Sequence, residues 1–600
     1  MKKRRAEARS TVTATRWSPS RLWPVLVVAA ITWLVYANSL HNEFLFDDLE
    51  TIVAEQTAGG SGHFGQLSSL LKGGAAYRPI RSASYAFDYA LSGRDPWGYH
   101  LSNIAYHTLS AVVVFLIAQS LFKRLTPALF TAILFAIHPI QTESVTYLSG
   151  RRDVLAGFFV LLGLYLFLRY RQTGRAGYLA SVLLVYPLAF FSKESGIILP
   201  LLCFGYDLIS RIQAKESTPG IPTLQEIGTC AWSAVREARL FYMPLVVLGG
   251  GLAFYVLFFV RGTWVRTYYG GSLWFTGLTM ARVFLHYIKL LIFPLTLNVD
   301  YSAFPVTTSW TDAEALAAVL ILAALGYGVL RCLRTKPIVA IGGVWFFAAL
   351  LPVSQIIPHH DMMAEHFLYT PSVGFFLMIA GLLDPLVDHP KAAPALYVAG
   401  AVVLLLLSLR TVWRNTDWRD DLTLWSQTVQ VAPQTARARN NLGSAYLRRG
   451  EIARAEEEIE TAVRLQPDFA TAHGNLGKIA FDRDDLERAE RELQTAVRLN
   501  AGEMIPHLWL GTVLVRMGRV PEAEQQFRAA LAKAPYDAYA HNNLGVLFAK
   551  DGRMAEAEAA FRAALARIPD LSEAQQNLAR LQRLRGSGGL TVEPVRGAVP

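Results

Sequence analysis

The sequence is poor in charged residues and in cysteine, and both shortages exclude classes of protein. Only 17% of its 600 residues are charged, whereas 52% are hydrophobic. This balance excludes a string of ordinary soluble domains and predicts that much of the surface faces lipid. The three cysteines, Cys203, Cys230 and Cys332, show no disulfide, zinc-ligand or redox spacing. The sequence therefore predicts neither a disulfide framework nor a zinc site.

Motifs for nucleotides and nucleic acids are also absent. The sequence has no Gly-rich phosphate loop, so neither ATP nor a nucleotide sugar is expected as a direct substrate. The net charge of +10 is spread over loops and repeats and forms no sustained basic patch. We therefore expect no nucleic-acid partner.

Twelve apolar runs lie between residues 22 and 410, and they predict a multi-span transmembrane domain in the lipid bilayer. A basic tail over residues 1–21 precedes the first run, and no small-residue cleavage site follows that run. We interpret the run as an uncleaved first span with its tail in the cytoplasm.

Basic loops give the expected orientation, because short loops rich in Lys and Arg stay cytoplasmic. Lys123 with Arg124, residues 169–175 and residues 331–336 all fall inside if the run 280–297 is re-entrant or interfacial. That run carries Arg282, His286 and Lys289. We therefore expect eleven spans, with residues 40–100 and the C-terminal domain outside.

From residue 436 the sequence repeats every 34 residues. This period, with small residues where two antiparallel helices approach, is typical of tetratricopeptide (TPR) repeats. We expect a half repeat or linker helix over 411–435, four repeats with a capping helix over 436–585, and a disordered tail over 586–600. The repeated positions are Leu442, Leu476, Leu510 and Leu544; Gly443, Gly477, Gly511 and Gly545; Ala455, Ala489, Ala523 and Ala557; Ala462, Ala496, Ala530 and Ala564; and Pro467, Pro535 and Pro569.

A TPR array normally presents a concave groove to a peptide. We take Asn441, Asn475 and Asn542, near the starts of first helices, as groove residues for a polypeptide acceptor or protein partner. An equal alternative is that they are helix caps and solvated positions. Nothing in the repeats looks catalytic. Neighbouring polar candidates are Asn440, His541 and Asn543.

Charged side chains are costly at membrane depth, so those beside apolar runs are the places to look for chemistry. Asp47 and Asp48 lie just beyond the first run. Two adjacent carboxylates can provide a general base, and repulsion between them raises the pKa of one. The alternative is a solvated pair in a loop.

A second cluster lies in HPIQTESVTYLSGRRDVLAG, residues 138–157, between two apolar runs. Arg151 and Arg152 stand at a predicted helix N-terminus, where forked donors and the helix dipole both favour phosphate. The alternative is that the residues of this run cap and pair with one another. Its other site candidates are His138, Glu143 and Asp153.

Three further clusters fall outside under the same topology. Arg78 and Lys193 join the arginines as candidate donor-phosphate ligands, although Lys193 and Glu194 can also simply neutralise each other. The histidines leave a divalent metal open, but the sequence fixes no ligand set, and no other cofactor is indicated. The clusters are Tyr77, Arg78 and Arg81 with His100 and His107; Lys193 and Glu194; and His359, His360, Asp361, Glu365 and His366.

Six segments carry a family resemblance. FLFDD, YRPI, FAIHPIQTESVTYLSGRRDVLA, FSKESG, FPLTLNVDYS and PVSQIIPHHDMMAEHFLYTPSVGF, followed by TPRs, resemble the transmembrane-and-TPR O-mannosyltransferase family and its bacterial relatives. The resemblance implies an all-α chain with a multi-span GT-C fold, which transfers a sugar, mannose being one candidate, from a polyprenyl phosphate to a protein hydroxyl on the outer side. It also implies an inverting reaction, and an acidic residue near the acceptor that maps onto Asp47 or Asp48.

Other functions and the location stay open at this point. A non-catalytic membrane scaffold would need only one or two helices to anchor the TPRs. A transporter would place its polar residues at the bilayer midplane, whereas here they gather at helix ends. The sequence has no Asn-x-Ser/Thr site, which favours a bacterial inner membrane, with the TPRs periplasmic, over the endoplasmic reticulum.

Overall fold

The computed structural model describes residues 22–48, 52, 78–215, 220–255, 258, 267–359 and 361–586. These residues form helices and turns, with no strand among them, and they fall into two compact units. The first unit holds the described chain up to Asp420 except Asp300–Ala303; the second holds those four residues and the chain from Asp421. The expected all-α class, a multi-span domain followed by a TPR solenoid, is confirmed. The N-terminal basic tail and residues 587–600 of the expected disordered tail lie outside the described residues.

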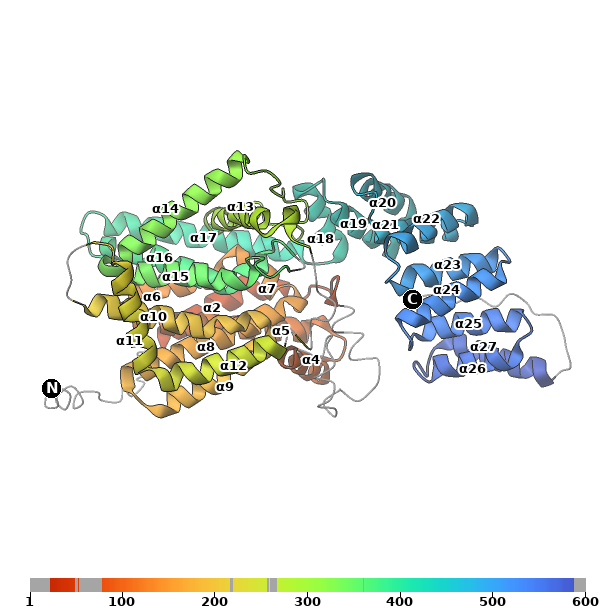
Figure 1. Ribbon diagram of the computed structural model, residues 1–600, viewed down its shortest axis with the longest axis horizontal. Helices are drawn as coiled ribbons and strands as arrows, with labels where there is room; N and C mark the ends of the chain where they lie inside the picture. The colour runs from red at the N-terminus through yellow and green to blue at the C-terminus, as the bar shows by residue number, and fades with distance from the viewer. Residues whose placement is uncertain are drawn as a thin grey trace. The chain divides into compact units, whose positions relative to one another are not determined.

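Long helices make up the first unit (Figure 1). α5 shows how the sequence sets their ends: Asp95 accepts a hydrogen bond from the backbone of Trp97 at the start, and Lys123 adopts a left-handed conformation at the end. The helices are α2 (Trp23–Tyr36), α4 (Pro79–Ser92), α5 (Pro96–Phe122), α6 (Leu125–Ile137), α7 (Thr142–Val145), α8 (Arg151–Thr173), α9 (Ala176–Ser192), α10 (Leu199–Ala214), α11 (Leu224–Glu237), α12 (Arg239–Tyr255), α13 (Leu273–Ile292), α14 (Ala313–Thr335), α15 (Pro337–Leu350), α16 (Tyr369–Val387) and α17 (Ala393–Asp417). Short 3-10 turns are η2 (Ala37–Ser39), η7 (Pro139–Gln141), η8 (Leu148–Gly150), η9 (Glu194–Ile198), η11 (Tyr269–Gly271), η12 (Leu351–Val353) and η13 (Glu365–Leu368).

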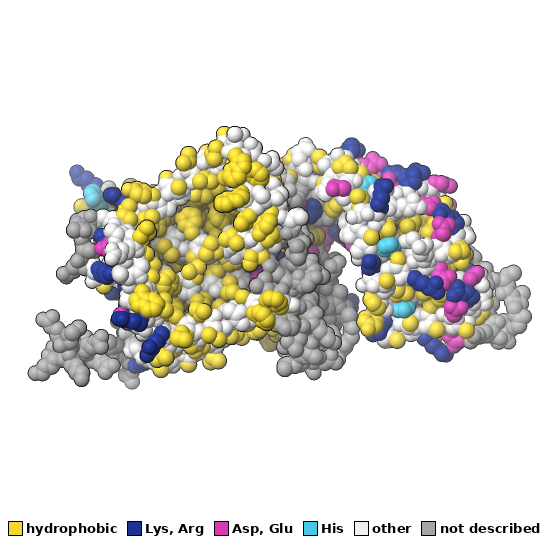
Figure 2. Space-filling model, in the orientation of Figure 1, with side chains coloured by type: hydrophobic (Ala, Val, Ile, Leu, Met, Phe, Trp, Pro, Cys, Tyr) yellow, Lys and Arg dark blue, Asp and Glu magenta, His cyan; other side chains and the backbone are white. Residues whose placement is uncertain are grey.

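Seven of the described helices are long and apolar enough to cross a membrane, or up to nine if each of two bent pairs counts as one span. Three shorter apolar segments accompany them, namely Trp23–Ser39, Ala176–Ser192 and Pro337–Val353. Hydrophobic side chains dominate the visible surface of this unit (Figure 2). A multi-pass membrane protein is thus confirmed, whereas the count of eleven spans stays a prediction.

One helix bears on the expected topology. α13 runs unbroken from Leu273 to Ile292 and is long and apolar enough to span. The re-entrant or interfacial placement of residues 280–297 stays a prediction.

The second unit is built from paired helices. Each repeat contributes two antiparallel helices that meet at a glycine: a Cβ atom on Gly477 would lie 2.5 Å from Leu493, and one on Gly511 would lie 2.6 Å from Phe527. No larger residue fits this approach without a shift. The helices are α18 (Asp421–Val431), α19 (Ala436–Arg448), α20 (Ile452–Leu465), α21 (Ala470–Asp482), α22 (Leu486–Leu499), α23 (Met504–Arg516), α24 (Val520–Lys533), α25 (Ala538–Lys550), α26 (Met554–Leu565) and α27 (Ser572–Gly586).

Candidate functional site

The segment between α6 and α8 forms the floor of the candidate site. Residues 138–150 fold into three short turns, η7, α7 and η8, and every one of them is buried. Gly150 lets the turns close on themselves, because a Cβ atom there would lie 2.5 Å from the carbonyl oxygen of Glu143. The chain therefore places a tightly folded polar segment at the ends of two long apolar helices.

Asp48 is bound to this floor from the loop after α2. Its Oδ1 accepts hydrogen bonds from the Ser149 backbone N–H at 2.8 Å and from the Ser149 hydroxyl at 2.5 Å. Its Oδ2 accepts one from the Leu45 backbone N–H at 3.0 Å. Burial raises the pKa of Asp48 to about 7, and the charge of Asp47 contributes least among the causes. The expected raised pKa is present, but desolvation is its main cause and repulsion is not.

Asp47 has a different environment. Its side chain is half-buried, whereas Asp48 is fully buried. A base near neutral pH needs a pKa close to the working pH, and the raised pKa of Asp48 meets this requirement. We therefore concentrate the predicted role of the pair on Asp48.

Arg151 is enclosed by the protein. Its side chain is 0% exposed, pairs with Asp88 at 2.5 Å and stacks over the Tyr85 ring at 4.6 Å. Nε donates to Asn103 at 2.6 Å, and the terminal nitrogens donate to the Tyr99 carbonyl and, more weakly, to Ser84. This geometry argues against the predicted phosphate-binding role of Arg151, because no face of the guanidinium remains for a ligand. Arg151 instead holds α4 and α5 against the start of α8.

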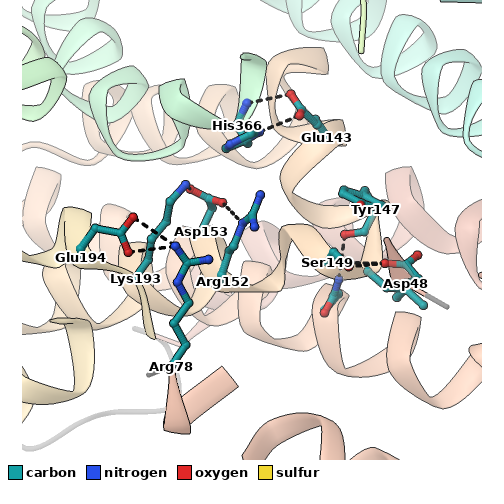
Figure 3. A network of polar contacts seen from close by, with 12 residues as sticks. Asp48, Arg78, Glu143, Tyr147, Ser149, Arg152, Asp153, Lys193, Glu194 and His366 are labelled. Carbon is teal, nitrogen blue, oxygen red and sulfur yellow. Dashed lines mark hydrogen bonds and ion pairs between the residues drawn. The ribbon is translucent and has the colours of Figure 1, made fainter. Parts of the chain in front are cut away.

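Arg152 points elsewhere and begins a chain of ion pairs (Figure 3). It is a quarter exposed and lies 3.6 Å from Asp153, and its Nε has no hydrogen-bond partner among the described residues. Lys193 lies in the turn between α9 and η9, and its ammonium group pairs with Asp153 at 2.6 Å. Beside them, the Arg78 guanidinium contacts both carboxylate oxygens of Glu194, at 3.0 and 3.1 Å.

The predicted alternative for Lys193 and Glu194 is not what the structure shows. The two residues do not neutralise each other; Lys193 turns to Asp153 and Glu194 turns to Arg78. The predicted phosphate ligands Arg78, Arg152 and Lys193 thereby come together from α4, α8 and the end of α9 (Figure 3). Each cation has a carboxylate neighbour. An incoming phosphate would therefore share the cation with that carboxylate or displace the carboxylate.

A second pair closes the other side of the site. Glu143 accepts hydrogen bonds from the His366 backbone N–H at 2.9 Å and from its Nδ1 at 2.6 Å, which fixes this face of the imidazole (Figure 3). The neighbouring Glu365 is fully buried; it accepts from the Asn298 backbone at 2.5 Å and lies 3.7 Å from Arg414. Both carboxylates thus have defined partners inside the unit.

Several histidines have structural roles in the described residues. His138 accepts the Ile140 backbone N–H on Nδ1, and its Nε2 lies 3.1 Å from the Leu291 carbonyl. His100 and His107 also contact backbone carbonyls. Among the described residues no group of three or more His, Cys, Asp or Glu is arranged to hold a metal ion. Tyr77 and His360, which the sequence also singled out, lie outside the described residues.

The asparagines of the repeats divide into two kinds. Asn542 is fully buried and accepts a hydrogen bond from Asn577 at 3.0 Å, so it joins neighbouring repeats and does not line a groove, contrary to our expectation. Asn475 is partly exposed but also bridges repeats, donating to Asn440 at 2.9 Å. Asn441 is partly exposed and stays a groove candidate.

Sequence reasoning missed Asp88, Ser149 and Arg414. Asp88 is a buried charge whose partner Arg151 is distant in sequence. Arg414 pairs with the nearby Asp417 at 3.1 Å and also lies 3.7 Å from the distant Glu365, and Ser149 is a hydroxyl among many. A usable signal existed for Asp88 and Arg414, because a charged residue inside or at the end of an otherwise apolar helix needs a partner.

Known proteins match both halves of the chain. The family model described as dolichyl-phosphate-mannose-protein mannosyltransferase matches residues 79–224, and a tetratricopeptide repeat model matches residues 409–459, 441–503 and 509–572. "Protein O-mannosyl-transferase F38B6.6" of Caenorhabditis elegans is 28% identical over 74% of this chain and 62% of its own length. "Protein O-mannosyl-transferase TMTC4" of Homo sapiens is 27% identical over 71% and 64%. The chain thus spans less than two thirds of the length of these relatives.

One solved structure is similar to part of the chain. The thermophilic TPR protein TTC0263 of Thermus thermophilus is 24% identical, with a TM-score of 0.25, over 31% of this chain and 97% of that one. The resemblance inferred from the motifs is confirmed by the relatives: over about 70% of its length the chain is similar to the TMTC protein O-mannosyltransferases.

Proposed function

We propose that the chain is a membrane glycosyltransferase that moves a sugar from a polyprenyl phosphate to a hydroxyl of a polypeptide on the external face. The observation that carries the proposal is the buried carboxylate of Asp48, whose pKa is raised to about 7 and which hydrogen bonds to the same segment that presents Arg152. A base held by Ser149 and a cationic cluster that includes the nearby Arg152 suit a reaction that removes a proton and releases a phosphate.

The reaction balances with these groups. Asp48 accepts the proton of the acceptor hydroxyl while the hydroxyl oxygen attacks the anomeric carbon of the sugar. The bond from that carbon to the phosphate oxygen breaks, and polyprenyl phosphate leaves with its charge near Arg152. A single displacement inverts the anomeric centre. Mannose is the sugar that the relatives' names favour.

Arg78 and Lys193 support the donor side of this site. Their carboxylate partners, Glu194 and Asp153, hold the two cations in place without a ligand. Arg152 is the more available cation, because it has only the 3.6 Å contact to Asp153. We therefore assign the first contact with the donor phosphate to Arg152, with Lys193 and Arg78 completing the field.

Direct transfer with purified full-length protein tests the proposal. The protein is incubated with a polyprenyl-phosphate [14C]mannose and a Ser/Thr-containing peptide, and label on the peptide is measured. We expect label from this donor and none from GDP-mannose supplied without lipid carrier. Equal transfer from GDP-mannose, or no transfer from mannosyl, glucosyl or galactosyl polyprenyl phosphates, would overturn the proposed donor class.

The external placement of the TPR unit is tested separately. Single cysteines are introduced at exposed positions, Arg528 in the repeats and Arg331 in the basic segment at the end of α14, after Cys203, Cys230 and Cys332 are replaced by alanine. An impermeant thiol reagent applied to intact spheroplasts should label position 528 and leave 331 unlabelled until lysis. The reverse pattern would place the repeats in the cytoplasm.

A further inference from the structure

A cavity in the membrane unit lies between α13 and α14, apart from the site just described. Its volume is about 600 Å3, and most of its wall is apolar. The apolar lining includes Leu285, Ile288 and Ile292 from α13, Phe293 directly after it, and Ala317 and Ala318 from α14. The surface of the unit is hollowed beside these helices, and hydrophobic side chains surround the hollow (Figure 2).

One edge of the cavity is basic. Arg282, His286 and Lys289 follow one another at helical spacing on α13 and all line it. Arg282 is already neutralised, because it pairs with Asp312 at 3.2 Å and with Glu314 at 2.5 Å. Lys289 is exposed and makes no ion pair within the described part of the chain. A positive charge thus stands without a carboxylate partner at the edge of an apolar hollow.

The position of this lysine matters physically. α14 is almost entirely exposed along its apolar window, so the cavity opens toward the surroundings of a membrane helix and not into the protein core. An apolar hollow in that setting fills with hydrocarbon chains, and a lysine there reaches for a lipid phosphate. Lys289 lies within one turn of the end of α13, which leaves its ammonium within reach of the headgroup layer.

We propose that this cavity binds one anionic glycerophospholipid of the bilayer, with an acyl chain along the apolar wall and its phosphate at Lys289. The occupant differs from the sugar donor, because no residue that lines the cavity belongs to the cluster around Arg152. The proposal therefore does not rest on the proposed function. Arg282, with Asp312 and Glu314, fixes the start of α14 against α13 and so holds the cavity open.

Native mass spectrometry of the full-length protein in detergent can count bound lipids. The protein is titrated with phosphatidylglycerol or phosphatidylcholine, and the same is done for Lys289→Gln, for Ala317→Phe and for the control Lys391→Gln. Ala317 is exposed, so the larger side chain enters the cavity with little disturbance of the helix packing. Lys391 is an exposed lysine in the turn before α17 and does not line the cavity.

We expect one retained phosphatidylglycerol per chain and no comparable retention of phosphatidylcholine. Lys289→Gln should weaken binding roughly fivefold, as expected for one basic residue at an anionic lipid surface. Ala317→Phe should abolish it, and Lys391→Gln should leave it unchanged. Equal retention of both lipids, or unchanged binding in the first two variants, would overturn the proposal. Displacement of the lipid by equimolar polyprenyl phosphate would also overturn it and would assign the cavity to the donor.

Discussion

Two ion pairs of the same chemistry show how differently the two halves of the molecule treat charge. Arg151 and Asp88 in the membrane unit lie 2.5 Å apart, with side chains 0% and 1% exposed. Arg516 and Asp484 in the repeat unit lie 2.6 Å apart, with side chains 51% and 71% exposed. The distances are nearly equal, but water can replace a lost partner only in the second pair. Distance alone therefore says little about what a charge does here.

The same contrast separates chemistry from scaffolding. In the membrane unit, buried charges such as Asp48 and Lys193 come from other parts of the chain and contact Ser149 and Asp153 of the segment 138–157. In the repeat unit, charges such as those of Arg454 and Arg516 form pairs on the surface, while glycines and alanines form the contacts between helices. Reactive groups are thus expected in the first unit and a binding surface in the second.

Asp48 gives the largest expected effect within the membrane unit. Asp48→Asn removes the basic carboxylate but keeps the shape of the side chain, so we expect transfer to fall by roughly 10²–10⁴-fold, the usual contribution of a general base. Donor binding should change little. Turnover and donor KM are measured on folded, inserted protein. Asp47→Asn is the matched control and should lose far less; an equal loss in both variants would remove the distinction between a buried base and its partly exposed neighbour.

The buried ion pair gives the next largest effect. Arg151→Gln leaves Asp88 buried without its cation, and we expect the free energy of unfolding to fall by about 3–5 kcal/mol. Arg516→Gln, in the exposed pair of the repeat unit, should cost about 0–1 kcal/mol. Thermal unfolding of the full-length protein in detergent compares the two. Equal destabilisation would show that burial does not decide how much an ion pair stabilises this protein.

Arg152 is expected to differ from its neighbour Arg151 in what its replacement changes. Arg152→Gln removes a charged donor near the incoming phosphate, so the donor KM should rise roughly tenfold or more, as for a lost hydrogen bond to a charged group. Thermal stability should stay near that of the wild type, because the side chain is partly exposed. A stability loss like that expected for Arg151→Gln, with unchanged donor KM, would assign Arg152 a structural role instead.

Two glycine-to-alanine changes in the repeats are expected to change the free energy of unfolding in opposite directions, and the smaller change is the gain at Gly474. Gly477→Ala places a Cβ atom 2.5 Å from Leu493, so we expect a loss of about 1–3 kcal/mol through overpacking. Gly474→Ala, one turn earlier on α21, meets open space and should stabilise by about 0.5–1 kcal/mol through helix propensity. Limited proteolysis of the repeat unit within the full chain reports both. Destabilisation by Gly474→Ala would show that this position does not face open space, and an unchanged stability in Gly477→Ala would contradict the close contact with Leu493.

Periodic features of this fold could be predicted from the sequence, and partner choices could not. The 34-residue repeat locates helix contacts because every repeat copies the same packing, and Gly477 indeed lies against Leu493. The cluster at 138–157 was located because charges beside apolar runs are rare. Arg151 and Arg152 were not distinguishable, since a helix turns by about 100° per residue and the sequence does not say which side faces inward. The prediction that Asn542 lines the groove is wrong for the same reason, because the sequence does not say that this side of α25 faces the next repeat.

The pH dependence of sugar transfer tests whether Asp48 is the base of the reaction. Asp48 acts as a base only when it is deprotonated, and burial raises its pKa to about 7. For the wild type, kcat/KM for the acceptor should therefore be constant above this pKa and fall about tenfold for each pH unit below it. The residual transfer by Asp48→Asn should lack that acidic limb. The same limb in Asp48→Asn, or a flat profile from about pH 5 to 8 in the wild type, would contradict the assignment of Asp48 as the acceptor-side base.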